Sequence, residues 1–242
     1  MPVKWYFGKV IQIKDASPTT KRFWVEIPND ESITFKAGQF VVMDLPIGDK
    51  RLQRWRSYSI ANPPIENGKV LEFCIVRLDQ GVAGTYFFKE VTVGTEIKFK
   101  APDGNFCLPE EIDHDLVLVC TGTGVAPFRS MLWNIHINNI PHQKIHLIFG
   151  TRFKEGILYR NEFEELKKLL PDFHYDIALS QEEDENAYKG YVHQIYMNKY
   201  QNVKPDTKFY LCGWSKMVDD AVANLIVKMK LDKEQVVYEL YG

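Results

Sequence analysis

The stretch LVLVCTGTGVAPFR, residues 116–129, joins an apolar run to a glycine-rich turn and then to a segment with helical periodicity. The apolar run fits a buried strand, and the glycines let the backbone approach a diphosphate closely. The helix that follows offers free N–H groups and a positive dipole end to the same phosphates. This order predicts a nucleotide site built from Thr121, Gly122, Thr123, Gly124 and Pro127, with the proline in the first helical turn, where no N–H is missed.

The pattern departs from the usual dinucleotide fingerprint in two ways. It reads Gly-x-Gly-x-x-Pro instead of Gly-x-Gly-x-x-Gly, and the next apolar strand, 145–149, ends in Gly150-Thr151-Arg152 without an acidic residue. The order of strand, turn, helix and second strand is nevertheless more specific than the turn alone.

Hydrophobic periodicity divides the chain into two halves. Short β segments separated by turns fill the first half and predict an antiparallel β-barrel, with strands at 9–13, 21–27, 39–45, 56–60, 70–76 and 95–101. Strands and helices then alternate and predict a doubly wound parallel sheet, with strands at 116–120, 145–149, 174–179, 209–211 and 236–238 and helices at 127–138, 161–170, 191–199 and 217–230. We expect two domains, 1–110 and 111–242.

The barrel half contains the run Arg56-Ser57-Tyr58-Ser59. Alternate residues of a strand share one face, so Arg56 and Tyr58 can approach one ligand together while Ser59 reaches another part of it. A flavin nucleotide offers a phosphate for the guanidinium, a flat ring for the phenol and a ring nitrogen for the hydroxyl. Taken alone, the four residues fit a half-buried strand with a surface arginine at least as well.

Six motifs in order make the chain similar to the ferredoxin–NAD(P) reductase-like flavoproteins along nearly its whole length. Beside 56–59 and 121–128, they are Gly81-Val82-Ala83-Gly84-Thr85-Tyr86, Ala101–Phe106, the segment Leu211–Met217 with Cys212-Gly213, and the ending Glu239-Leu240-Tyr241. The resemblance implies a flavin-diphosphate turn at Gly81, Gly84 and Thr85. It also implies that Cys212 and Glu239 orient a nicotinamide and that Tyr241 covers the flavin. Two departures are Gly84, where many members carry Ser, and Gly242 after the terminal tyrosine.

The resemblance implies an FAD enzyme that moves hydride between NAD(P)H and FAD, with Ser59 polarising the flavin nitrogen, and passes electrons to ferredoxin or flavodoxin. A flavin reductase, an oxygenase-component reductase, an electron-transfer subunit and a cofactor-free binding module are the alternatives. Without the resemblance, Cys212 reads as a small core residue, Glu239 as a solvated charge and Tyr241 as a tail aromatic.

Discrimination between NADH and NADPH depends on the segment after Ser180. Members that use NADPH often carry arginines for the 2′-phosphate, whereas this chain has Gln181 and Tyr191 at those positions and keeps only Arg152. The acidic run 182–185 would repel a phosphate, although Lys189 could offset it. We therefore favour NADH.

Composition excludes several other classes. The net charge of −2 gives no electrostatic case for nucleic acid. The 4 cysteines form no Cys-x-x-Cys pair, which argues against zinc and against an iron–sulfur cluster. The apolar runs are strand-sized and the N-terminal residues lack a signal-peptide pattern, so we expect a cytoplasmic protein without membrane insertion.

Overall fold

The computed structural model describes residues 4–28 and 32–241, and Gly242 lies outside them. Contacts between residues divide the chain into two units. The first unit comprises residues up to Cys107 together with Ala126–Asn134, and the second comprises Leu108–Val125 and the residues from Ile135 onward. The limits 1–110 and 111–242 stay our proposal for the two cofactor-binding domains.

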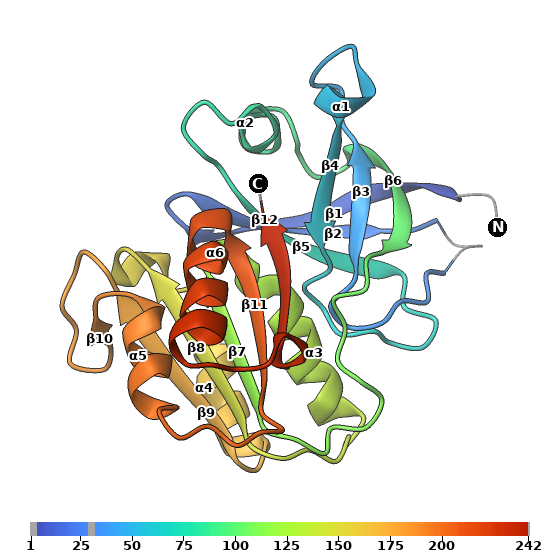
Figure 1. Cartoon of the computed structure of the whole chain (residues 1–242). Helices are drawn as coiled ribbons and strands as arrows, with labels where there is room; N and C mark the ends of the chain where they lie inside the picture. The colour runs from blue at the N-terminus through green and yellow to red at the C-terminus, as the bar shows by residue number, and fades with distance from the viewer. Residues whose placement is uncertain (1–3, 29–31, 242) are drawn as a thin grey trace. The chain divides into compact units, whose positions relative to one another are not determined.

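The first unit is built on an antiparallel sheet of six strands in the order β4-β3-β6-β1-β2-β5 (Figure 1). The strands are β1 (Trp5–Ser17), β2 (Thr20–Glu26), β3 (Phe40–Asp44), β4 (Trp55–Ser59), β5 (Val70–Val76) and β6 (Glu96–Asp103). The edge strands β4 and β5 also contact each other, so the sheet curls toward a barrel. The predicted antiparallel barrel is confirmed.

Strand β1 is longer than the predicted segment 9–13 at both ends, and it includes Gly8. A Cβ on Gly8 would lie 2.5 Å from Cγ1 of Val25, so the glycine lets β1 pack closely against β2. Two irregularities in the pairing with β2, at Val10/Gln12 and Asp15/Ser17, allow the strand to bend and continue.

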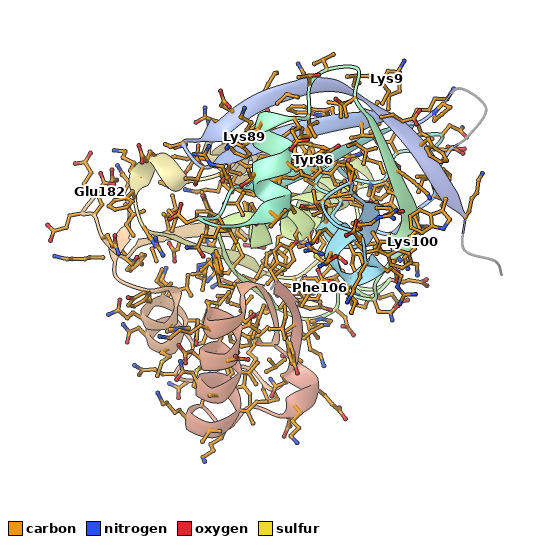
Figure 2. The ribbon with its side chains drawn as sticks, turned by 90° about the horizontal axis from the view of Figure 1, so that it is seen from above. Lys9, Tyr86, Lys89, Lys100, Phe106 and Glu182 are labelled. Atoms are coloured by element: carbon orange, nitrogen blue, oxygen red, sulfur yellow. The ribbon has the colours of Figure 1, made fainter. Side chains whose placement is uncertain are left out.

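The structure corrects the predicted turn at Gly81–Tyr86. Gly81 is the N-cap of helix α2 (Val82–Lys89), and α1 (Arg51–Arg54) is a second short helix of this unit. Figure 2 shows Tyr86 and Lys89 on α2. The sequence did not predict this helix, because glycine at position 84 is typical of a turn. A Cβ on Gly84 would lie 2.6 Å from the carbonyl oxygen of Val76, so this glycine lets α2 pack on the end of β5.

The second unit contains a parallel sheet in the order β10-β9-β8-β7-β11-β12 (Figure 1). Its strands are β7 (Leu116–Thr121), β8 (Ile145–Thr151), β9 (Phe173–Leu179), β10 (Tyr188–Lys189), β11 (Lys208–Trp214) and β12 (Val236–Tyr241). Chain order runs from β7 through β10 on one side and returns through β11 and β12 on the other. The predicted parallel α/β architecture is confirmed, and its topological switch point lies between β7 and β11.

The helices are α3 (Val125–Ile137), α4 (Arg160–Leu169), α5 (Val192–Lys199) and α6 (Ser215–Ala223), with 3-10 turns at η1 (Gly122–Gly124), η2 (Lys154–Gly156) and η4 (Lys233–Gln235). Helices α5 and α6 bury apolar residues against one face of the parallel sheet. The predicted helix 217–230 is wrong at its end, because residues 224–228 form a π-helix, η3 (Asn224–Lys228). Strand β11 extends beyond the predicted 209–211, because Cys212, Gly213 and Trp214 still pair with β12.

Within residues 4–28 and 32–241, no helix is both long and apolar enough to span a membrane. The cytoplasmic location stays a prediction.

Candidate functional site

Strand β4 presents the Arg56–Ser59 motif. Arg56 and Tyr58 are partly buried and Ser59 is 5% exposed. The positive charge of Arg56 lies near enough to lower the pKa of Tyr58, although burial has the larger effect and raises that pKa well above its usual range, so the phenol stays neutral. The structure therefore brings the cation and the aromatic ring of the motif together.

Helix α2 orients the ring of Tyr58. Phe87 contacts this ring edge-on, with centroids 5.5 Å apart, and also contacts Phe23 at 5.1 Å. Since Phe87 lies on the helix that begins at Gly81, the Arg56–Ser59 and Gly81–Thr85 motifs meet around one buried aromatic cluster. The N-cap residue Gly81 has no side chain, so it makes no capping hydrogen bond to the start of α2. The first N–H groups of α2 could therefore bind an anion.

The guanidinium of Arg56 has donors to spare for a phosphate. Its Nη1 donates to the carbonyl oxygens of Leu52 at 2.9 Å and Trp55 at 2.7 Å. A guanidinium has five N–H donors, so these contacts hold the side chain without using all of them. The residues around β4 and α2 thus fit the phosphate and the flat ring of a flavin nucleotide.

The third barrel motif, Ala101–Phe106, ends beside β3. Phe40 pairs with Ser59 of β4 and with Asp103 of β6, so the ends of these strands lie on either side of it. Gly104 has a φ of +91°, and a Cβ there would lie 2.5 Å from the Phe40 ring. Phe106 (Figure 2) is 4% exposed and packs against Phe128 at 5.7 Å.

The nucleotide turn forms the 3-10 helix η1 and leads directly into α3, with Pro127 in its first turn. Its two glycines serve different purposes. Gly122 has a φ of +52°, and apart from neighbours in the chain the nearest described atom to a Cβ there would be Nε1 of Trp214, at 3.9 Å. A Cβ on Gly124 would lie 2.4 Å from the carbonyl oxygen of Cys212. Space therefore remains beside Gly122, whereas Gly124 lets the turn η1 pack closely against the end of β11.

Gly213, on β11, also allows a close contact with the end of β7. Its φ is +141°, and a Cβ there would lie 2.5 Å from Oγ1 of Thr121. The need for a glycine in the Cys-Gly motif thus arises from packing between strand ends.

Cys212 lies in a row of side chains across three strands. Register pairs it with Cys120 of β7 and with Glu239 of β12. Cys212 is fully buried, and burial raises the pKa of its thiol far above the usual range, with Glu239 acting in the same direction; a hydrogen bond from the Tyr241 side chain partly opposes the shift. The structure therefore brings Cys212, Glu239 and Tyr241 together, with the thiol protonated.

The segment after Ser180 lies beside the end of β8. The N–H of Ser180 donates to the carbonyl oxygen of Thr151, and that of Gln181 to the carbonyl oxygen of Arg152, both at 3.0 Å. The carboxylate of Glu182 (Figure 2) accepts the backbone N–H of Lys154 at 2.6 Å. A depression of about 630 Å³ is lined by Phe153, Lys154, Glu155 and Glu182.

The lysines of this segment are already paired. Lys154 forms an ion pair with Asp184, and Lys189 forms one with Glu183. These hydrogen-bonded pairs lower the pKa of both carboxyl groups. Arg152 is exposed and forms no ion pair with any described residue.

Sequence reasoning missed the buried charges around Glu72. Its carboxylate, 3% exposed, accepts Nε of Arg22 at 2.6 Å and Nη1 of Arg129 at 3.0 Å. Nη1 of Arg129 also donates to the carbonyl oxygen of Ala61 at 2.8 Å, and Oγ of Ser130 donates to that of Asn62 at 2.7 Å. One sequence feature could have predicted these ion pairs. Glu72 lies inside the apolar strand VLEFCIV, and a buried charge requires partners.

Comparison with known proteins agrees with this arrangement. Residues 8–107 match the oxidoreductase FAD-binding domain family, and residues 118–223 match the oxidoreductase NAD-binding domain family. The phenol hydroxylase P5 protein of Acinetobacter pittii is 29% identical over 235 residues, which cover 96% of this chain and 64% of that protein. Ferredoxin–NADP reductase B of Sorangium cellulosum is 28% identical over 218 residues, 87% of each chain.

A solved structure, the cytochrome P450 reductase of Amycolatopsis, superposes with a TM-score of 0.88 at 26% identity, over 99% of this chain and 70% of that one. The fold and the two domain matches define an FAD- and NAD-binding oxidoreductase. The chain belongs to the ferredoxin–NAD(P) reductase-like family of flavoproteins. The predicted family, FAD and a pyridine nucleotide are thereby confirmed. The chain spans 64% of the length of the phenol hydroxylase P5 protein and 62% of the length of the phenol 2-monooxygenase reductase component of Pseudomonas sp. strain CF600.

Proposed function

We propose that this protein is an FAD-dependent reductase that oxidises NADH and passes electrons one at a time to a protein carrier. The observation that supports this most directly is the pairing of Arg56 and Tyr58 on β4 with the uncapped start of α2, through Phe87. When bound, FAD supplies the conversion of a two-electron hydride into single electrons.

The chain's own residues bind and orient the cofactors. In this proposal Arg56, Ser57, Gly81, Gly84 and Thr85 hold the flavin diphosphate, Tyr58 stacks on the ring and Ser59 donates a hydrogen bond to it. In the second unit, Thr121, Gly122, Thr123, Gly124 and Pro127 bind the nucleotide diphosphate. Such positioning lowers an activation barrier by roughly 7–11 kcal/mol when reacting groups are well aligned.

The row formed by Cys212 on β11 and by Glu239 and Tyr241 on β12 would orient the nicotinamide. A protonated thiol at Cys212 is a weak hydrogen-bond donor and no nucleophile, so its role in this proposal is contact with the ring, beside Gly213. Glu239 would accept from the carboxamide. Tyr241 would cover the flavin and move aside for the nicotinamide, because a residue at the end of an edge strand can swing with little cost.

The test is anaerobic addition of NADH to the purified yellow protein while the flavin absorbance is followed. We expect stoichiometric FAD and rapid bleaching by NADH. Ferredoxin, flavodoxin or free flavin is then added to compare acceptors. A colourless protein that takes up no FAD contradicts the proposal, and preference for free flavin over both carriers contradicts the assignment of a protein acceptor.

A reductase component of an oxygenase is the second candidate. The match over 93% of this chain to the reductase component of a phenol 2-monooxygenase favours it. In that case the oxygenase, and neither ferredoxin nor flavodoxin, accepts electrons at the highest rate.

The preference for NADH rests on the paired lysines. Asp184 and Glu183 neutralise Lys154 and Lys189, and Glu155 and Glu182 line the depression. Of the three basic positions expected for a 2′-phosphate, Arg152 alone is basic in this chain. We expect kcat/KM to favour NADH by at least about tenfold, because a phosphate there meets like charges. Glu182→Arg should lower the ratio of kcat/KM for NADH to kcat/KM for NADPH, and Glu165→Arg, at an exposed position of α4, should leave that ratio unchanged. Equal use of both nucleotides by the unaltered protein contradicts the preference.

A further inference from the structure

Trp214 lies at the switch point of the parallel sheet. It is the last residue of β11, and Gly122 follows directly on β7. In open parallel α/β sheets, ligands bind beyond the carboxyl ends of the strands, where the strand order reverses. Trp214 therefore stands at the place where topology predicts a bound nucleotide.

The backbone holds Trp214 in position on both sides. Its own N–H donates to Oγ1 of Thr121 at 3.4 Å. Gly213, directly before it, lies against Thr121, and Oγ of Ser215, directly after it, donates to the carbonyl oxygen of Tyr241 at 3.2 Å. The residue is thus fastened to the ends of β7 and β12.

The indole ring, in contrast, has little around it. Trp214 is 51% exposed, and apart from the chain neighbours of Gly122 its Nε1 is the one described atom within 4 Å of a Cβ built on that glycine. No described residue accepts a hydrogen bond from this N–H. A lone exposed aromatic residue is common. An indole whose unsatisfied donor lies beside the open, left-handed glycine of a phosphate turn is a more specific arrangement.

We propose that Trp214 is a nucleotide-binding residue whose Nε1–H donates a hydrogen bond to the diphosphate held at the Gly122 turn. An indole N–H is a donor only, so it matches an anion. The ring would also shield one side of the diphosphate from water, which strengthens each hydrogen bond made to it. This inference rests on the proposed binding of a pyridine nucleotide in the second unit.

The test measures the affinity of the FAD-loaded protein for ADP-ribose, which contains the diphosphate without nicotinamide, and for adenosine, which lacks both phosphates. Trp214→Phe keeps an aromatic ring and removes the N–H. We expect it to weaken ADP-ribose binding by about tenfold, the loss of one hydrogen bond to a charged group, and adenosine binding by less than about twofold. Trp214→Leu, which also removes the ring, should weaken ADP-ribose further.

Trp24→Phe is the matched control, because Trp24 lies on β2 and packs against Lys14 and Arg22 in the first unit. An unchanged thermal unfolding midpoint and flavin spectrum verify that each variant is folded. Unaltered ADP-ribose affinity in Trp214→Phe overturns the inference, and so does an equal loss for adenosine. If the unaltered protein binds neither ADP-ribose nor NAD, the proposed nucleotide site fails and this inference fails with it.

Discussion

At the scale of single residues, Arg56 is the sharpest test of the flavin site. Arg56→Ala removes a charge-assisted contact, so we expect FAD affinity to fall by roughly ten- to a hundredfold, about 1.5–3 kcal/mol. Arg51→Ala is the control, because Arg51 stacks on Trp55 in the same segment and has no assigned cofactor contact. The measurement is flavin retained after dialysis. If both variants retain equal amounts of flavin, residues other than Arg56 bind the flavin phosphate.

Cys212 and Cys120 form a natural matched pair for the nicotinamide site. Both are fully buried and lie in register on β11 and β7, so replacement by alanine leaves a cavity of similar size. We expect Cys212→Ala to slow flavin reduction by NADH by about tenfold or more, roughly 1.4 kcal/mol per factor of ten, with flavin still bound. Cys120→Ala should keep the unaltered rate. Equal rates in rapid mixing would make Cys212 a packing residue.

At the scale of elements, helix α2 depends on the absence of a side chain at position 84. Alanine favours a helix over glycine by about 1 kcal/mol. The clash of its Cβ with the Val76 carbonyl, at 2.6 Å, is with backbone that cannot rotate away. Overpacking typically costs about 1–3 kcal/mol, so we expect Gly84→Ala to lower the unfolding free energy and loosen FAD. Lys89→Ala, at the exposed end of α2, is the control. A stabilised Gly84→Ala variant would show that α2 can shift freely.

The Arg22–Glu72–Arg129 triad fastens α3 to β5 and β2. Glu72→Gln leaves two guanidinium groups around a neutral amide, and breaking a buried pair in this way typically costs about 3–5 kcal/mol. We expect a correspondingly lower urea midpoint. The double variant Glu72→Leu/Arg129→Leu should recover much of the loss, because well-packed apolar residues often replace a buried ion pair without cost. Additive losses would mean that the charges act independently.

A buried polar network ties β8 to β9 and α5, and it predicts a dependence of stability on pH. Nε2 of His146 contacts Asp176 at 2.9 Å, and its Nδ1 contacts the hydroxyl of Tyr200 at 2.9 Å. Burial lowers the pKa of His146 despite the carboxylate. The unfolded imidazole, with a pKa of about 6.5, then binds a proton more readily than the folded one, so stability falls as pH drops below about 6.5.

His146→Gln should flatten this part of the profile measured by chemical denaturation at several pH values. The hydrogen bonds of Asp176 to His146 and Lys199 outweigh burial and lower its pKa to about 2, so a second loss should follow between about pH 4 and pH 2. A flat profile above pH 4 in the unaltered protein would contradict the role given to His146.

At the scale of the whole molecule, periodicity was sufficient to predict both sheets, because alternating and continuous apolar runs reflect burial on one or two faces. It could not assign purposes to the glycines. Gly122, Gly124 and Gly213 look alike in sequence, yet of these three only Gly122 has room for a Cβ. Periodicity also could not predict the ion pair between Glu72 and Arg129, because these residues lie far apart in the chain and their spacing does not indicate a contact.

The path of α3 limits how this protein can be recombined with its relatives. Residues 126–134 group with the first unit although the chain has already entered the second. A chimera that joins residues 1–107 to the C-terminal half of another family member would therefore combine Glu72 with a foreign helix and a foreign partner for its charge. An exchange that keeps β2, β5 and α3 from one parent preserves the triad. Because the residues of the two units alternate along the chain, the gene segments that encode them alternate too. A single crossover therefore does not separate one unit from the other.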